Sequence, residues 1–191
     1  MKKIAALLLA LCLTLICASA LAAGKLEVTQ ETYVPMEAYS SLYGYVFAEV
    51  QNTGDKPIEY GSGVLEILTE DGESTDSADV YTMYPAVLGA GEKGYIHYMD
   101  VTDATALDQI ADHTLSVIGK STKEEPLTRV EGSAVYETRE TTYSSYQTVR
   151  ATLTNNTDAT LYDFQTVVAL YDAEGHLLYV DTDMNYNLRL P

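Results

Sequence analysis

The sequence predicts an all-β protein made of two consecutive modules and one short helix. Three observations favour this class: segments in which apolar and polar residues alternate, turn residues between these segments, and a repeat at a spacing of 103 residues. The composition is typical of a globular chain, because 47% of the 191 residues are apolar and 20% are charged.

The first residues have the pattern of an export signal, which we place at residues 1–22. Lys2 and Lys3 give a positive start, residues 4–16 are apolar, and Ala20 and Ala22 form the small-x-small pattern of a cleavage site. The apolar run is shorter than the roughly 20 residues that span a membrane. We therefore expect a secreted, extracytoplasmic or envelope-associated protein with no membrane span.

Removal of 22 of the 191 residues leaves 169. Both cysteines, Cys12 and Cys17, lie in the removed segment, so we expect a mature chain without disulfides. Loss of Lys2 and Lys3 changes the formal charge from −17 to −19. Phosphate backbones repel such a chain, and we expect no nucleic-acid partner.

The clearest strand of the first module covers residues 43–50. Successive side chains of a strand point to opposite faces. One face carries Tyr43, Tyr45, Phe47 and Glu49, and the other carries Val46, Ala48 and Val50.

Turn residues separate this strand from those that follow. We predict turns at residues 52–55 and 71–72, because Asn and Asp accept bonds from nearby main-chain N–H groups and Gly tolerates positive φ. Further strands are predicted at residues 58–60, 64–68, 80–83, 94–99 and 115–118, with a polar connection at residues 73–79. Residues 105–111 have helical spacing, with Thr105 or Asp103 as the N-cap, and predict one short helix.

A shift of 103 residues aligns the two halves of the chain without a gap. The identical pairs are Val46 with Val149, Ala48 with Ala151, Asn52 with Asn155, Asp55 with Asp158, Val64 with Val167, and Gly72 with Gly175. We interpret the repeat as two copies of one module, at residues 23–120 and 129–191, joined by a linker at residues 121–128. Two unrelated β-domains with similar turns are the alternative.

Apolar strand positions also align and give the predicted core. In the first module this core is Val46, Ala48, Val50, Ile58, Leu65 and Ile67; in the second it is Val149, Ala151, Leu153, Leu161, Val168 and Leu170. Leu190 aligns with about Leu88, so the second module lacks counterparts of its last strands, residues 89–119. We interpret the sequence as a fragment; if the chain ends at Pro191, strand exchange with another subunit is the alternative.

Residues 164–172 of the second copy read Phe-Gln-Thr-Val-Val-Ala-Leu-Tyr-Asp, followed by Gly175. This segment resembles the signature of the FxLYD domain family of bacterial secreted and cell-envelope proteins, although Val168 stands where the family has phenylalanine. The signature residues are Phe164, Leu170, Tyr171 and Asp172. The resemblance implies an immunoglobulin-like antiparallel β-sandwich, often in tandem and without known catalysis.

The signature also has a structural interpretation that needs no family. Leu170 is expected in the core, Tyr171 on the opposite face, and Asp172 as an acceptor of N–H bonds in the turn at Glu174 and Gly175.

The sequence contains no catalytic motif among those with a defined spacing, so we predict a non-enzymatic protein without cofactor or metal. An enzyme would need His97, His113 or His176 to meet carboxylates in a cleft. Residues 71–79 and 181–183 could hold calcium if their loops curled, but solvated loops are the preferred interpretation.

Tyrosine is abundant, with 16 tyrosines against two phenylalanines and no tryptophan. A tyrosine ring packs on a sheet while its hydroxyl stays hydrated, which suits a binding face. The candidate contact residues are Tyr43, Tyr45, Tyr95, Tyr143 and Tyr146. We expect a non-catalytic interaction module that binds an unidentified protein or cell-envelope component, and the alternative is a carbohydrate-binding module.

Overall fold

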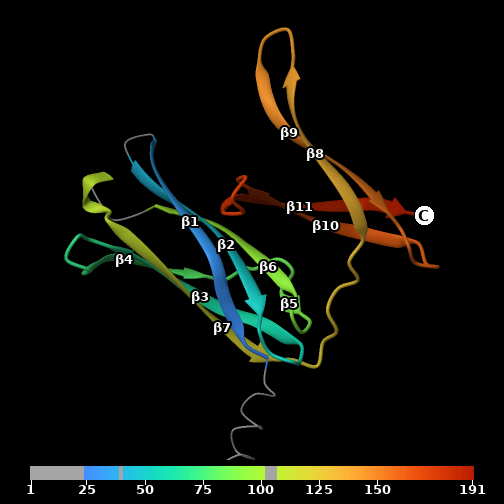
Figure 1. Cartoon of the computed structure of the whole chain (residues 1–191), viewed down its shortest axis with the longest axis horizontal. Helices are drawn as coiled ribbons and strands as arrows, with labels where there is room; N and C mark the ends of the chain where they lie inside the picture. Colours follow the sequence, from blue (N-terminus) through green and yellow to red (C-terminus); the bar gives the residue numbers. More distant parts are fainter. Residues whose placement is uncertain (1–23, 39–40, 102–106) are drawn as a thin grey trace, which may run out of the picture. The chain divides into compact units, whose positions relative to one another are not determined.

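The computed structural model describes residues 24–38, 41–101 and 107–191 (Figure 1). Over these residues the chain is all-β and forms several small antiparallel sheets, which confirms the predicted class. The strands are β1 (Leu26–Ala38), β2 (Ser41–Asn52), β3 (Ile58–Leu68), β4 (Ser74–Val80), β5 (Val87–Leu88), β6 (Lys93–Val101), β7 (Asp112–Ser121), β8 (Glu131–Glu140), β9 (Ser145–Thr154), β10 (Leu161–Tyr171) and β11 (Leu177–Leu190). The predicted export signal, residues 1–22, lies outside the described residues.

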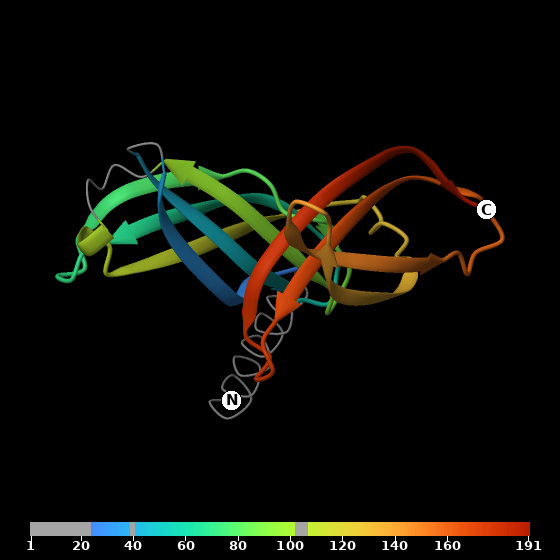
Figure 2. The same ribbon diagram turned by 90° about the horizontal axis from the view of Figure 1, so that it is seen from above.

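The chain divides into two compact units. Unit 1 consists of Met1–Pro126 together with Ala169–Val180, and unit 2 consists of Leu127–Val168 together with Asp181–Pro191. The hairpin of β10 and β11 therefore contributes residues to both units, and Figure 2 shows this hairpin as a long curved ribbon.

Two sheets of unit 1 contribute to one hydrophobic core. One sheet has the order β1-β2-β6; in the other, β3 pairs with β4, β5 and β7. Val46 and Ile96 from the first sheet and Leu65 and Leu115 from the second belong to the same buried cluster. Alternation along each strand directs these apolar side chains to one face.

All six residues of the predicted core of the first module are buried, which confirms that prediction. They are Val46, Ala48, Val50, Ile58, Leu65 and Ile67. The predicted strands at residues 94–99 and 115–118 are found within β6 and β7.

The opposite face of β2 is also buried, which alternation alone does not predict. Phe47 and Glu49 are only 4% and 2% exposed. Residues 169–180 of unit 1 contact this face: the ring of Tyr179 lies 4.9 Å from that of Phe47, and Tyr171 donates a hydrogen bond to Glu49. β2 is therefore covered on both faces.

The strand boundaries differ from the predicted ones at two places. Residues 58–60 and 64–68 belong to one continuous strand, β3. The predicted polar connection at residues 73–79 lies mostly in β4, and the strand predicted at residues 80–83 is wrong beyond Val80. β4 is an edge strand, where polar side chains can face water without cost to the core.

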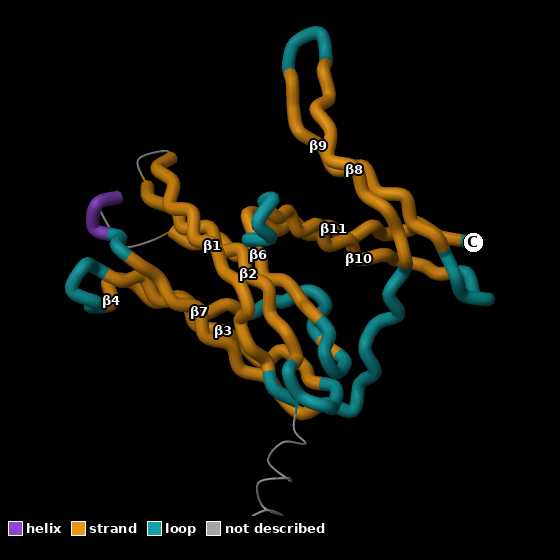
Figure 3. The backbone as a smooth tube through the Cα atoms, viewed as in Figure 1, coloured by secondary structure: helices purple, strands orange, loops and turns teal. Residues whose placement is uncertain are grey.

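The predicted helix is reduced to a short turn. The structure has a 3-10 turn at Leu107–Gln109, purple in Figure 3, while Thr105 and Asp103 lie outside the described residues. None of the three residues is buried, and a short segment without packing does not sustain an α-helix. Nowhere in residues 24–38, 41–101 and 107–191 is there a helix long and apolar enough to cross a membrane.

Asn52 and Asn155 make matching hydrogen bonds, 103 residues apart. In each, Oδ1 accepts from the main-chain N–H two residues later at 3.0 Å, and Nδ2 donates to the carbonyl four residues later at 2.8 or 2.7 Å. Nδ2 also donates to Leu88 in the first case, at 3.1 Å, and to Leu190 in the second, at 3.2 Å. Leu88 and Leu190 are the residues that the sequence repeat aligns.

Strand pairing follows the same shift. β10 begins and ends 103 residues after β3. Glu31 pairs with Ala48 between β1 and β2, and Ala134 pairs with Ala151 between β8 and β9, so the registers correspond from Gln30 onward, beyond the irregularity between Val28 and Gln30. The turns match as well, since Gly72 and Gly175 both have positive φ, at 78° and 87°.

The predicted core of the second module is wrong. Val149, Leu161, Val168 and Leu170 are half-buried, and Ala151 and Leu153 are exposed. In unit 1, β2 also pairs with β6 and β3 also pairs with β7, whereas among the described residues β9 pairs only with β8 and β10 only with β11. An apolar strand face becomes a core only when a second layer covers it.

Candidate functional site

The carboxylate of Glu49 is the centre of a polar cluster in unit 1. Its Oε1 lies 2.8 Å from Nζ of Lys93 and accepts a bond from the Thr29 hydroxyl at 2.7 Å. Its Oε2 accepts a bond from the Tyr171 hydroxyl at 2.6 Å, and that hydroxyl also lies 3.2 Å from the hydroxyl of Tyr95. Every oxygen of the buried carboxylate therefore has a partner.

The partners of Glu49 fix its ionisation. Burial alone raises the pKa of Glu49, but hydrogen bonds from Lys93, Tyr171 and Thr29 outweigh it, so its pKa lies below the ordinary value. Burial raises the pKa of the Tyr171 hydroxyl, and the bond to Glu49 raises it further. At neutral pH the cluster is an ionised carboxylate held by neutral and cationic donors, an arrangement that fastens residues 169–180 to β2.

An aromatic group adjoins this cluster. The ring of Phe47 lies 5.3 Å from His97 and 4.9 Å from Tyr179, and His97 lies 6.2 Å from Tyr179. His97 is half-buried. Residues 169–180 provide the cover that the strand pattern did not reveal.

The other two histidines lie in different surroundings. His113 stacks on Tyr33 at 5.1 Å, and its Nε2 lies 3.8 Å from Oε1 of Glu31. Burial raises the pKa of Glu31, and His113 partly offsets this. His176 is exposed and its Nδ1 lies 2.9 Å from Oδ2 of Asp172.

No group of three or more histidine, cysteine or acidic side chains that could hold a metal ion occurs in the part of the chain that the structure describes. In each of the two acidic segments at least one carboxylate has a local partner. Asp79 accepts a bond from Tyr81, and Asp181 accepts one from the N–H of Thr182. That both segments are solvated loops stays a prediction, with calcium binding as its alternative.

The five candidate tyrosines fall into two groups. Tyr43, Tyr45 and Tyr95 are half-buried in β2 and β6 of unit 1, and Tyr95 joins the Glu49 cluster. Tyr143 and Tyr146 belong to the β8–β9 hairpin of unit 2 and are 96% and 44% exposed. The five candidates therefore belong to two different units.

The signature residues are also divided. Phe164 is half-buried in unit 2, while Leu170, Tyr171 and Asp172 belong to unit 1. Asp172 Oδ1 accepts bonds from the N–H groups of Glu174 and His176, at 3.0 and 2.8 Å, which is the turn contact that the sequence predicts. These bonds hold the pKa of Asp172 below its ordinary value, the bond from the main-chain N–H of His176 contributing most.

Sequence reasoning missed the bond between Tyr171 and Glu49. The available signal was a single carboxylate on a strand face otherwise occupied by Tyr43, Tyr45 and Phe47. A carboxylate among aromatic side chains needs a donor if the face is covered. Nothing in the local pattern identified a donor 122 residues away.

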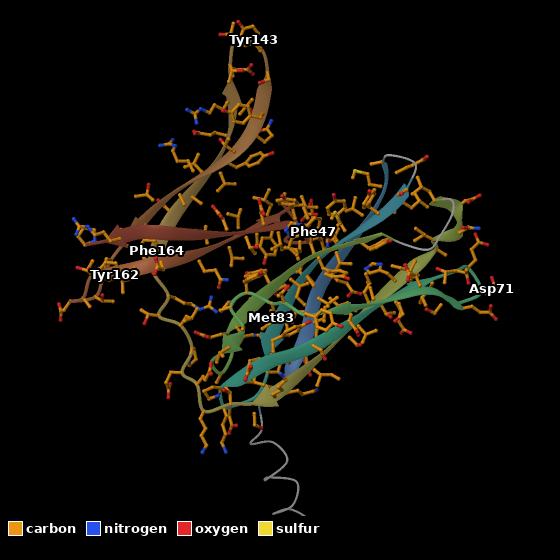
Figure 4. All side chains as sticks on the ribbon, turned by 180° about the vertical axis from the view of Figure 1, so that it is seen from behind. Phe47, Asp71, Met83, Tyr143, Tyr162 and Phe164 are labelled. Carbon is orange, nitrogen blue, oxygen red and sulfur yellow. The ribbon has the colours of Figure 1, made fainter. Side chains whose placement is uncertain are left out.

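The β8–β9 hairpin is the candidate binding surface. Its exposed apolar and aromatic residues are Val135, Tyr136, Tyr143, Tyr146 and Leu153. Figure 4 shows Tyr143 at the tip of the hairpin with its side chain pointing outward. Such a concentration on a short two-stranded element is typical of a contact surface.

No protein-family model, curated protein or solved structure matches the chain.

Proposed function

We propose that this protein is a secreted or cell-surface, non-catalytic interaction module that binds a protein or cell-envelope component. The observation that carries the proposal is the exposed β8–β9 hairpin, whose tip bears Tyr143, 96% exposed, with Tyr146 close behind. Exposed tyrosines are favoured at binding surfaces because a large rigid ring is combined with a polar hydroxyl.

We further propose that the chain consists of two tandem immunoglobulin-like β-sandwich modules of the FxLYD type. The matching bonds of Asn52 and Asn155 and the common strand register support two copies of one module. The family resemblance itself rests on residues 164–172.

The proposed location outside the cytoplasm rests on residues 1–22. The test is the intact mass of the secreted product. A mass that begins at Ala23 supports export, and retention of Met1 in the cell contradicts it.

A sedimentation assay with bacterial envelope fractions tests the proposed binding. We expect the double variant Tyr143→Ala with Tyr146→Ala to bind at least about tenfold more weakly than the unmodified chain. Tyr81→Ala is the matched control, because Tyr81 is 70% exposed but lies in unit 1. Equal binding by all three proteins would reject the hairpin as the contact surface.

A carbohydrate-binding module is the second candidate, favoured by three exposed tyrosines, Tyr136, Tyr143 and Tyr146, on one hairpin. A glycan array separates it from protein binding. Retention of a glycan that is lost in the Tyr143→Ala, Tyr146→Ala variant supports this alternative, and an array without binding rejects it.

A further inference from the structure

The face of the β1-β2-β6 sheet that is turned away from the core, here called the outer face, has a covered part and an exposed part. The strand register places its side chains in four cross-strand rows: Gln30 with Glu49 and Tyr95, Thr32 with Phe47 and His97, Val34 with Tyr45 and Met99, and Met36 with Tyr43. Residues 169–180 contact the first two rows. We call the five residues of the last two rows the open rows.

The covered part of the outer face holds the main chain of an extended segment. The side-chain oxygen of Gln30 accepts a bond from the N–H of Leu177 at 2.7 Å, and the Thr32 hydroxyl donates to the carbonyl of the same residue. Leu177 begins β11, and the ring of Tyr179, two residues later, packs on Phe47 at 4.9 Å. This part of the face therefore binds polypeptide through a main-chain group and through a side chain at an alternate position.

The open rows form an exposed apolar surface. Val34 and Met36 are each 41% exposed, Met99 is 49% exposed, and Tyr43 and Tyr45 are half-buried in the central strand. None of these five side chains carries a charge, on a chain whose formal charge is −17. Contiguous apolar residues on a surface are typical of an interaction site, and flexible methionine side chains adapt to a partner.

The open rows continue the surface that binds residues 177–179. The ring of Tyr45 stacks on Phe47 with 6.4 Å between the ring centroids, and Phe47 is the ring on which Tyr179 packs. Successive rows are two strand residues apart, about 7 Å, which is also the spacing of alternate side chains in any extended segment. A segment aligned with β2 can therefore place its alternate side chains on successive rows.

We propose that the open rows bind an extended peptide segment of another protein, with aromatic or aliphatic side chains at alternate positions. The segment packs on the face of the sheet, as residues 177–179 do, and the hydroxyls of Tyr43 and Tyr45 can bond to its main chain. A charged side chain directed at the open rows would lose water without gaining an ionic partner there. The inference goes beyond the proposed function, because it concerns unit 1 and not the β8–β9 hairpin.

Fluorescence polarisation with synthetic peptides and the full chain tests the proposal. The probe peptide has tyrosine and leucine at alternate positions, threonine between them and one lysine at each end. The control peptide has the same composition, with the tyrosines and the leucine adjacent. We expect the alternating peptide to bind at least about tenfold more tightly than the control peptide, because its apolar side chains match the row spacing.

A pair of double variants locates the binding surface. Met36→Gln with Met99→Gln removes apolar contact from the open rows at exposed positions, and should weaken binding of the alternating peptide at least about fivefold. Tyr81→Gln with Ile118→Gln is the matched control, because these residues are also exposed and apolar but belong to other strands and loops of unit 1. The control variant should bind like the unmodified chain. Circular dichroism and cooperative unfolding establish that each variant folds.

Three results would overturn the proposal. The first is equal binding of the two peptides, or no binding of either, by the unmodified chain. The second is equal weakening by both double variants. The third is association of two copies, or binding to phosphatidylcholine vesicles, that Met36→Gln with Met99→Gln abolishes while no peptide binds, because another occupant would then be identified.

Failure of this inference is distinguishable from failure of the proposed function. Tyr143→Ala with Tyr146→Ala should bind the alternating peptide like the unmodified chain, since these tyrosines belong to unit 2. A chain that binds envelope fractions but no peptide would reject this inference and leave the proposed function standing. A chain that binds the alternating peptide but no envelope fraction would do the reverse.

Discussion

Units 1 and 2 repeat the same asparagine turn and the same strand pairing but bury their apolar residues to different extents. Val50 of β2 is 0% exposed, while Leu153, its counterpart in β9, is 38% exposed. The two residues have similar side chains and similar places in their strands. Burial is therefore determined by the elements that cover a strand and not by its own pattern.

Both faces of strand β2 are covered by other parts of unit 1. One face contributes to the core with Val46, Ala48 and Val50, and the other lies under residues 169–180. The described part of unit 2 has no buried apolar residue. The comparison predicts that equivalent substitutions will have unequal effects in the two units.

The largest effect is expected from truncation of an equivalent apolar pair. Ile58→Ala in unit 1 should lower the free energy of unfolding by about 2–5 kcal/mol, because it leaves a cavity in a packed core. Leu161→Ala in unit 2 should lower it by less than about 1 kcal/mol, since Leu161 is half-buried. Urea unfolding checks both, and equal losses would show that unit 2 has a core of its own.

The second largest effect is expected from removal of the equivalent asparagine side chains, Asn52 and Asn155. Asn52→Ala should lower the free energy of unfolding by about 3 kcal/mol, because it leaves buried main-chain carbonyls without their donor. Asn155→Ala should cost less than about 1 kcal/mol, because water can replace the side chain at a half-buried position. Hydrogen exchange at the N–H groups of Gly54 and Thr157 gives a local measurement of each loss.

The third effect is the pH dependence of the Glu49 cluster. A carboxylate whose pKa is lowered in the folded state stabilises the fold above its unfolded pKa, about 4.3, and loses this contribution as the pH falls through the folded value. Glu49→Gln should cost about 2 kcal/mol at pH 7 through weakened bonds to Lys93 and Tyr171, and the difference should shrink below about pH 4.

Thermal unfolding between pH 3 and pH 8 checks this expectation. Glu66→Gln, at an exposed position of β3, is the control and should follow the unmodified chain. Glu31 acts in the opposite sense: its pKa is raised, mainly by burial, so its cost to stability is relieved as the pH falls. A pH-independent difference for Glu49→Gln would contradict the assigned ionisation.

Local features of the fold were predictable from the sequence. Alternation gave the core face of β2, and Gly72, Gly175 and Asp172 gave the turns. The contacts that bury Phe47 and Glu49 were not predictable, because their partners lie more than a hundred residues away. The core predicted for the second module failed for the same reason, since a repeat shows which residues correspond but not which strands cover them.

The smallest effect is expected from the ion pair of the β8–β9 hairpin. Arg150 and Glu137 face solvent, and their pKa values are shifted apart mainly by the hydrogen bond between them. Water and salt compete for both groups, so Arg150→Ala should leave the urea midpoint unchanged within error. A clear loss of stability in this variant would show that the pair of Arg150 and Glu137 holds the hairpin together despite its contact with water.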